Sequence, residues 1–137
     1  MQIAVYGCLP ALGVLAITGI QLWAAKMEIF SWTSEQTKKK FHFLDDDLFE
    51  RTTVLAANQG LYNLLLAAGL VWSLFIGDLV WAAKIAAFFL ALVWIAGVFG
   101  TWSARGGARV FWLPILGQTA TSTVALALLL SDWPSGS

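Results

Sequence analysis

The sequence predicts an all-α protein in which four helices span a membrane. Of its 137 residues, 59% are hydrophobic and 12% are charged, whereas a soluble domain carries about 25% charged residues. Eight tryptophans and nine phenylalanines add to this pattern, because aromatic side chains gather at lipid–water boundaries. Four apolar runs can each cross about 30 Å of hydrocarbon, and they cover residues 3–25, 54–76, 79–103 and 110–131. We expect residues 1–131 to form one domain and residues 132–137 a disordered tail.

The first run differs from a secretory signal peptide. It lacks a basic start, and its apolar part is longer than the 7–15 residues of a signal core. We therefore expect a retained helix, mildly kinked at Pro10. The single cysteine, Cys8, lies in this run. One thiol cannot form an internal disulfide and matches no metal-ligand spacing, so we interpret Cys8 as a buried apolar side chain.

Basic residues are distributed unevenly along the chain, and their distribution predicts the orientation. Those around the first and third loops are Lys26, Lys38, Lys39, Lys40, Arg51, Arg105 and Arg109, whereas only Lys84 belongs near the opposite side. Because cytoplasmic loops are rich in lysine and arginine, we expect loops 1 and 3 in the cytoplasm and both termini outside. The predicted location is the inner, cytoplasmic membrane. The formal net charge is zero, and we expect no nucleic-acid partner.

The connections between the runs differ in length. The second is essentially Gly77-Asp78, which forces the second and third spans into an antiparallel hairpin. The first, residues 31–53, is long and amphipathic. Its Lys38–Lys40 segment beside Phe41 and Phe43 is typical of an interfacial segment on an anionic leaflet, although a solvated loop fits equally well. Asp47 and Glu50 have capping-box spacing, which predicts that the second helix begins there.

The second span carries an unusual set of polar residues in the segment LAANQGLYNLLLAAG, residues 55–69. A polar side chain is costly in hydrocarbon unless it finds a partner. On a helical wheel the stripe Leu55, Gln59, Tyr62, Leu66, Gly69 and Ser73 predicts the face toward the other helices. The opposite stripe, Ala57, Leu61, Leu64, Ala68, Val71 and Phe75, suits lipid. Ala56 and Gly60 form a small-xxx-small pair that lets a neighbouring backbone approach.

Polar residues of three spans fall at similar depths, since a helix rises about 1.5 Å per residue. We expect Gln21, Glu28, Asn58, Gln59, Tyr62, Asn63 and Gln118 to converge in the cytoplasmic half. Two interpretations remain. These side chains either join the helices by hydrogen bonds worth about 0.6 kcal/mol each, or line a pocket open to the cytoplasm. Glu28 is the one candidate intramembrane carboxylate, unless it pairs at the interface with Lys26 or Lys40. His42 is interpreted as a surface histidine.

Several motifs resemble one bacterial membrane family, known as domain of unknown function 1304. They are MEIFSW at 27–32, LAANQGLYN at 55–63 followed by LLAAGL, then AAFFL, IAGVFG, and Gln118 near Pro114. The resemblance covers residues 17–130 and implies a four-helix membrane protein, with no established reaction. The family usually has a histidine seven residues before its helix-one glutamate, where this chain has Gln21. A proton-transfer or metal role at that position is therefore not implied here.

Three functional hypotheses follow. The first is a non-enzymatic membrane protein that binds a small apolar or amphipathic molecule, or serves as an accessory subunit. It is favoured because no nucleophile–base pair, metal cluster or phosphate loop is visible. The second is a small glutathione-dependent enzyme with lipophilic substrates, through Glu50, Arg51, Asn58 and Tyr62. The third is an oligomeric transporter that uses Glu28. No cofactor is indicated, and the expected partners are membrane lipids, other membrane subunits or further copies of the chain.

Overall fold

The computed structural model describes residues 7–42, 44–103 and 112–134, without the side chains of 112–115. Every regular element in this part of the chain is a helix, which confirms the all-α prediction. The elements are α1 (Cys8–Phe30), α2 (Glu35–Lys40), α3 (Asp46–Arg51), α4 (Thr53–Ser73), α5 (Leu79–Ser103) and α6 (Trp112–Ser131). The predicted start at residue 3 and half of the predicted tail, residues 135–137, lie outside the described residues.

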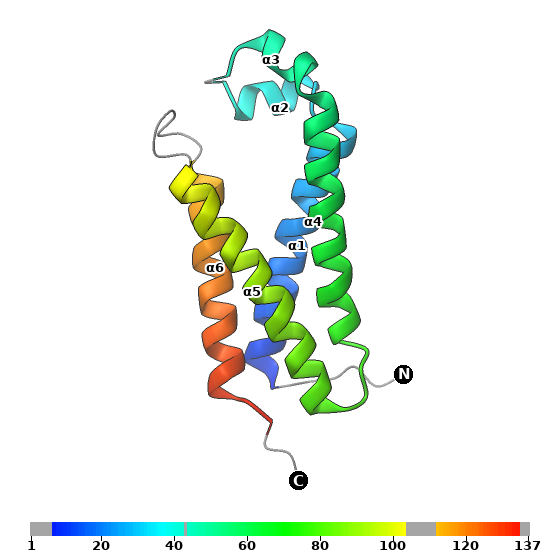
Figure 1. The fold of residues 1–137 in the computed structure, drawn as a ribbon, viewed down its shortest axis with the longest axis vertical. Coiled ribbons are helices and arrows are strands. Elements are labelled where there is room, and N and C mark those ends of the chain that lie inside the picture. Colours follow the sequence, from blue (N-terminus) through cyan, green and yellow to red (C-terminus); the bar gives the residue numbers. More distant parts are fainter. Residues whose placement is uncertain (1–6, 43, 104–111, 135–137) are drawn as a thin grey trace.

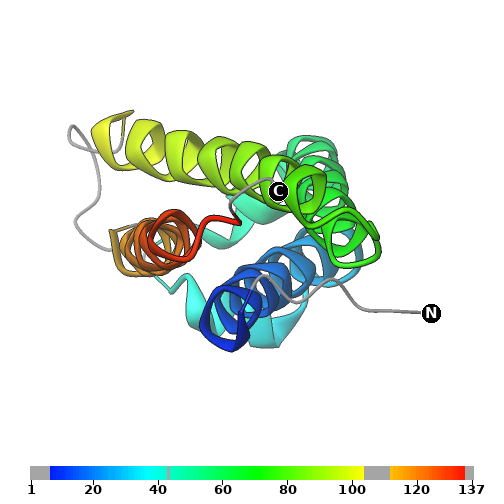
Figure 2. The same cartoon turned by 90° about the horizontal axis from the view of Figure 1, so that it is seen from below.

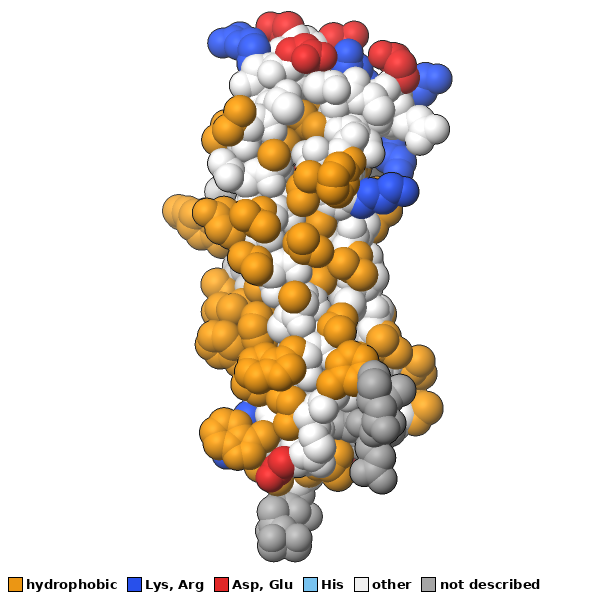
Figure 3. Space-filling model, turned by 90° about the vertical axis from the view of Figure 1, so that its right-hand side faces the viewer, with side chains coloured by type: hydrophobic (Ala, Val, Ile, Leu, Met, Phe, Trp, Pro, Cys, Tyr) orange, Lys and Arg blue, Asp and Glu red, His pale blue; other side chains and the backbone are white. Residues whose placement is uncertain are grey.

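Three of these helices, α1, α4 and α5, are long and apolar enough to cross a membrane. The fourth predicted span is also helical, as α6, but its described apolar part, Leu116–Ser131, is shorter than the other three. Hydrophobic side chains cover the middle of the face drawn in Figure 3, while charged side chains gather at the ends. This distribution is the one that a membrane-embedded protein requires.

The four long helices pack side by side as two antiparallel pairs, α1 with α4 and α5 with α6 (Figure 1). Seen along its length, the molecule has these helices in a ring ordered α1, α4, α5, α6 (Figure 2). The two pairs lie close together where α4 turns into α5, and they diverge toward the end that carries α2 and α3. The site described below lies at this diverging end.

The main apolar core occupies the end where the pairs converge. It is built by all four long helices from Val14, Ile17, Leu70, Leu74, Ala82, Ala83, Ala86, Leu90, Val93, Ala125 and Leu129. The predicted hairpin at Gly77-Asp78 is present, and the Asp78 carboxylate accepts hydrogen bonds from the first backbone N–H groups of α5. Helix α4 ends at Ser73, before the predicted residue 76. The backbone N–H groups of Leu74 and Phe75 instead donate to the carbonyl groups three residues earlier, as in a 3₁₀ turn.

Helix α1 continues to Phe30, five residues past its predicted end, so Glu28 lies on the helix. Cys8 lies in the first turn of α1 and is exposed. The prediction of a buried thiol was therefore wrong, because a residue in the first turn of a terminal helix has few neighbours to cover it.

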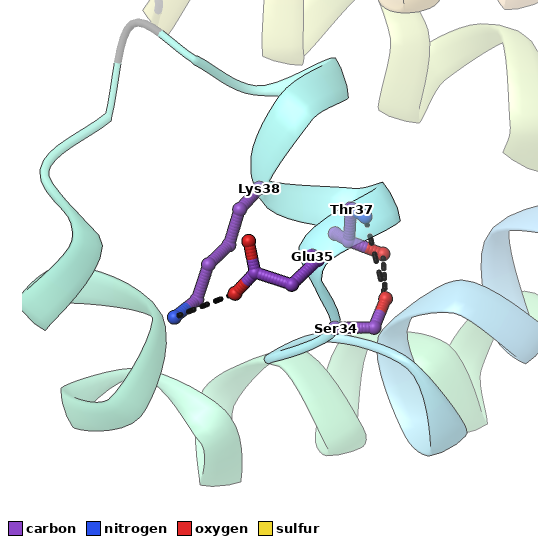
Figure 4. Close-up of polar contacts among 4 residues, drawn as sticks. All are labelled: Ser34, Glu35, Thr37 and Lys38. Atoms are coloured by element: carbon purple, nitrogen blue, oxygen red, sulfur yellow. Dashed lines mark hydrogen bonds and ion pairs between the residues drawn. The ribbon is translucent and has the colours of Figure 1, made fainter.

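The first loop folds into the short helices α2 and α3. Ser34 caps α2, because its hydroxyl oxygen accepts a hydrogen bond from the Thr37 backbone N–H at 3.3 Å and donates one to the Thr37 hydroxyl at 3.1 Å (Figure 4). Glu35 and Lys38, one turn apart, form an ion pair at 3.9 Å.

Phe41, which follows α2, faces the protein rather than a leaflet. It packs with Phe49 against Trp32, with ring centroids 5.8 Å and 5.2 Å from that tryptophan. Met27 completes this second, smaller core. The interfacial interpretation is therefore not supported for Phe41, whereas Phe43 lies outside the described residues.

The predicted helix start at Asp47 was wrong. Helix α3 begins at Asp46, and Asp47 instead pairs with Arg51 at 3.7 Å on the surface. The chain then bends at Thr52 before α4 starts. The Thr52 hydroxyl donates to the Leu48 carbonyl at 2.7 Å and accepts from the Trp32 indole N–H at 3.0 Å. These two bonds hold the corner between α3 and α4 against the end of α1.

Candidate functional site

Helix α4 approaches α1 through a stripe of small residues. Its buried positions are Ala56, Gly60, Asn63, Ala67, Gly69, Leu70 and Ser73. A Cβ atom added at Gly60 would lie 2.6 Å from Cγ1 of Ile29 and 3.2 Å from the carbonyl oxygen of Ala25. The α1 backbone therefore fits only against a glycine, and the predicted small-residue contact at Ala56 and Gly60 is confirmed.

The predicted inward stripe of α4 is displaced by about one residue. Leu55 is exposed, and Tyr62 keeps 60% of its surface exposed. Small residues decide the rotation of α4, because close contact with α1 needs Ala56, Gly60 and Ala67 between the helices. The polar residues at 59 and 62 consequently lie at the edge of the α1–α4 contact. Leu61, Leu64 and Phe75 of the opposite stripe, which is expected to face lipid, are all exposed.

Glu28 and Asn63 join α1 to α4 through their side chains. The Asn63 amide Nδ2 donates a hydrogen bond to Oε2 of Glu28 at 2.7 Å. Asn63 is only 8% exposed, and Glu28 is half-buried. In the described part of the chain, Glu28 forms no ion pair with Lys26 or Lys40, although the sequence had suggested one. Asn63 therefore orients a carboxylate that no described cation neutralises.

A cavity of about 700 Å³ opens between the two helix pairs, beside this hydrogen bond. We call it the inter-pair cavity. It is lined by Ile20, Trp23, Ala24, Met27, Glu28, Trp32, Phe41, Gln59, Tyr62, Asn63, Leu66, Ala96, Gly117, Gln118 and Thr121. Most of these side chains are apolar or aromatic. The polar ones come from both helix pairs: Glu28 from α1, Gln59, Tyr62 and Asn63 from α4, and Gln118 and Thr121 from α6.

A second cavity, of about 640 Å³, lies under α3 and is called the corner cavity here. Its lining is Glu28, Trp32, Leu44, Leu48, Thr52, Leu55, Ala56, Asn58, Gln59 and Tyr62. Glu28, Trp32, Gln59 and Tyr62 line both cavities. These four residues therefore mark the boundary between an apolar space within the helices and a space next to the charged end of the molecule.

The structure brings six of the seven predicted site residues to these cavities. Five line the inter-pair cavity, namely Glu28, Gln59, Tyr62, Asn63 and Gln118, whereas Asn58 lines the corner cavity. Gln118 also bonds to another helix, because its Nε2 donates to the Val93 carbonyl oxygen of α5 at 3.2 Å. Members of the polar cluster thus both join helices by hydrogen bonds and line a pocket. The sequence analysis had treated these as two alternative roles.

Gln21 is the exception. Its side chain is fully buried in α1 and lines neither cavity. Neither its Oε1 nor its Nε2 has a hydrogen-bond partner among the residues that the structure describes. The spacing argument could not show that the α1 surface around Gln21 is packed rather than open.

The sequence analysis missed the aromatic part of the lining, which comprises Trp23, Trp32 and Phe41. One signal was available for Trp32, since it lies four residues after Glu28, about one helical turn. Trp23 and Phe41 carried no such signal, because their places depend on how α2 folds back over α1. In the described part of the chain, no group of three or more His, Cys, Asp or Glu side chains is arranged so that it could hold a metal ion.

A family model described as "Protein of unknown function (DUF1304)" matches residues 8–130. The match covers nearly the whole chain, including all four long helices, so the chain belongs to the DUF1304 family. The resemblance found in the sequence motifs is thereby confirmed. No curated protein and no solved structure matches the chain.

Proposed function

We propose that this protein is a non-enzymatic, multi-pass protein of the bacterial cytoplasmic membrane that binds an amphipathic small molecule. The observation that carries the proposal is the inter-pair cavity, with the Glu28–Asn63 hydrogen bond on its wall. Ligand pockets typically measure about 300–1,000 Å³ and combine a mainly apolar lining with a few placed polar groups. At about 700 Å³ the cavity has both properties.

The lining suggests how such a molecule lies. Its polar part meets Glu28, Gln59 and Asn63, and its apolar part extends along Leu66 and Ala96. In a bilayer an apolar tail gains little by leaving lipid, because lipid chains are as apolar as leucine. The polar side chains of the lining therefore supply the selectivity, while the apolar lining makes the site compatible with a tail.

We further propose four spans, with α6 as the fourth and with loops 1 and 3 in the cytoplasm. Support comes from Lys26, Lys38, Lys39 and Lys40, which belong to the α2 end of the molecule, whereas Lys84 follows the opposite turn. Figure 3 shows most of the charged side chains of the drawn face at one end. In this orientation the corner cavity faces the cytoplasm, and the inter-pair cavity lies in the adjoining half of the bilayer.

The glutathione-dependent alternative receives no support from the geometry. Asn58 and Tyr62 share the corner cavity, but Glu50 and Arg51 line neither cavity. Arg51 instead pairs with Asp47 on the surface. The four residues that suggested this chemistry therefore do not form one site.

A matched pair of glycine variants tests the proposal. Gly117 lines the inter-pair cavity, and Gly19 lies on α1 outside both cavities. An added Cβ meets no atom within 4 Å at either position, so Gly117→Phe fills the cavity and Gly19→Phe does not. After extraction in mild detergent, native mass spectrometry should find a retained amphiphile on the wild type and Gly19→Phe, and none on Gly117→Phe. Equal retention by all three proteins, or none by the wild type, contradicts the proposal.

A further inference from the structure

Both cavities contain the same single formally charged side chain, Glu28. In the part of the chain that the structure describes, none of the residues that line either cavity is lysine, arginine or histidine. A half-buried carboxylate in an apolar setting is unfavourable unless something compensates its charge. Among the described residues, the formal charge that lines the two cavities is therefore negative.

Only one oxygen of this carboxylate is occupied. Asn63 donates to Oε2, and no described residue forms a hydrogen bond or an ion pair with Oε1. Because both cavities border Glu28, the second oxygen is available to a bound molecule. The Asn63 bond also fixes the direction in which the carboxylate points, which reduces the cost of ordering it when a ligand binds.

Aromatic rings surround the same space. Trp23, Trp32, Phe41 and Tyr62 line the inter-pair cavity, and Trp32 and Tyr62 extend into the corner cavity. The faces of such rings attract cations through their quadrupole. The protein already uses one of them in this way, because Nζ of Lys40 lies 4.8 Å from the centroid of the Trp23 ring.

We propose that the ligand is a lipophilic cation, an alkyl ammonium whose head lies against Glu28 and the aromatic rings. Its alkyl chain occupies the apolar part of the inter-pair cavity. A carboxylate beside several aromatic rings favours this head over a phosphate or carboxylate head, because the described lining of the cavities contains no cation for an anion. This inference rests on the proposed function and specifies its ligand class.

Three probes with the same chain and different heads test it: dodecyltrimethylammonium, dodecanoate and dodecanol. Binding is measured to the full chain in phosphatidylcholine nanodiscs, with empty nanodiscs subtracted. We expect the cation to bind tightest and dodecanoate weakest. Glu28→Gln should weaken binding of the cation by about tenfold or more, since an ion pair in a partly buried site is far stronger than in water. Its affinity for dodecanol should fall much less, because a neutral head loses no ion pair, and retained dodecanol binding also reports a folded site.

Glu35→Gln is the matched control, because it removes the same charge from an exposed residue that lines neither cavity. Equal binding of cation and anion, or equal effects of the two glutamine variants, overturns the cation inference and leaves the proposed function standing. If Gly117→Phe abolishes the binding of none of the three probes, the proposed function fails as well. Should Glu28→Gln not fold, the comparison of cation and anion on the wild type decides.

Discussion

The side chain of Asn63 on α4 donates a hydrogen bond to Glu28 on α1 at the place where the two cavities meet. One contact therefore serves two purposes. It fastens the closest helix pair of the protein, and it holds a carboxylate at the wall of the proposed binding site. The consequences for stability and for binding can be separated by experiment.

The Asn63→Ala variant should lower the free energy of unfolding by about 1–2 kcal/mol, because it leaves the half-buried Glu28 without its donor. Asn58→Ala is the matched control, since Asn58 is an exposed amide on the same helix and its loss should change stability by less than about 0.5 kcal/mol. Reversible unfolding in mixed detergent micelles measures both values. Equal losses from the two variants would show that the bond contributes nothing measurable.

The contact between α1 and α4 should not tolerate a side chain at Gly60. A Cβ there would approach Ile29 and the Ala25 backbone, so Gly60→Val should destabilise the protein by about 1–3 kcal/mol. Gly19→Val makes the same change in a helix with open space around it, which corrects for helix propensity. Thermal denaturation followed by circular dichroism compares the two. A Gly60→Val protein as stable as Gly19→Val is incompatible with the close approach described.

Gln21 should be replaceable at no cost. Methionine has nearly the same length and needs no hydrogen bond, whereas a buried unsatisfied amide costs about 1–3 kcal/mol. Because neither amide atom of Gln21 has a described partner, Gln21→Met should raise the free energy of unfolding by about 1 kcal/mol. The same denaturation measurement applies. A clear loss of stability would mean that the amide is satisfied in the folded protein, for example by a buried water.

The proposed orientation predicts which positions a membrane-impermeant maleimide reaches from outside the cell. In a Cys8→Ser background, Gly77→Cys lies in the α4–α5 turn and Gln36→Cys lies on α2, both at exposed positions. Gly77→Cys should react in intact spheroplasts, and Gln36→Cys only after permeabilisation. The opposite labelling pattern would reverse the topology.

The helices and most members of the polar cluster, though not Gln21, could be predicted from the sequence, because hydrophobic run lengths and the rise of about 1.5 Å per residue set the positions of both. Glu28 and Asn63 were both assigned to the cytoplasmic half by this spacing, and they form a hydrogen bond. Ala56 and Gly60 were identified as a contact from their spacing and small size, which is the property that lets two backbones approach.

The rotation of α4 could not be predicted from polarity. The stripe through Gln59 and Tyr62 was expected to face inward, but the need to place Gly60 against α1 turns it to the edge of the contact. The bend of the chain at Thr52 could not be predicted either, for a similar reason. It depends on the Trp32 indole, which is twenty residues away in sequence. Long-range packing of this kind leaves no local periodicity to detect.

Photo-crosslinking tests the binding cavity most directly. A dodecylamine that carries a diazirine in its alkyl chain is bound to the protein in nanodiscs and irradiated, and the labelled peptides are sequenced. Labelling should concentrate on the inter-pair cavity, at Leu66, Ala96 and the neighbourhood of Gly117, and should fall sharply in Gly117→Phe but not in Gly19→Phe. Labelling spread over the outward residues Leu61, Leu64 and Phe75, and unchanged in Gly117→Phe, would contradict a binding site between the helix pairs.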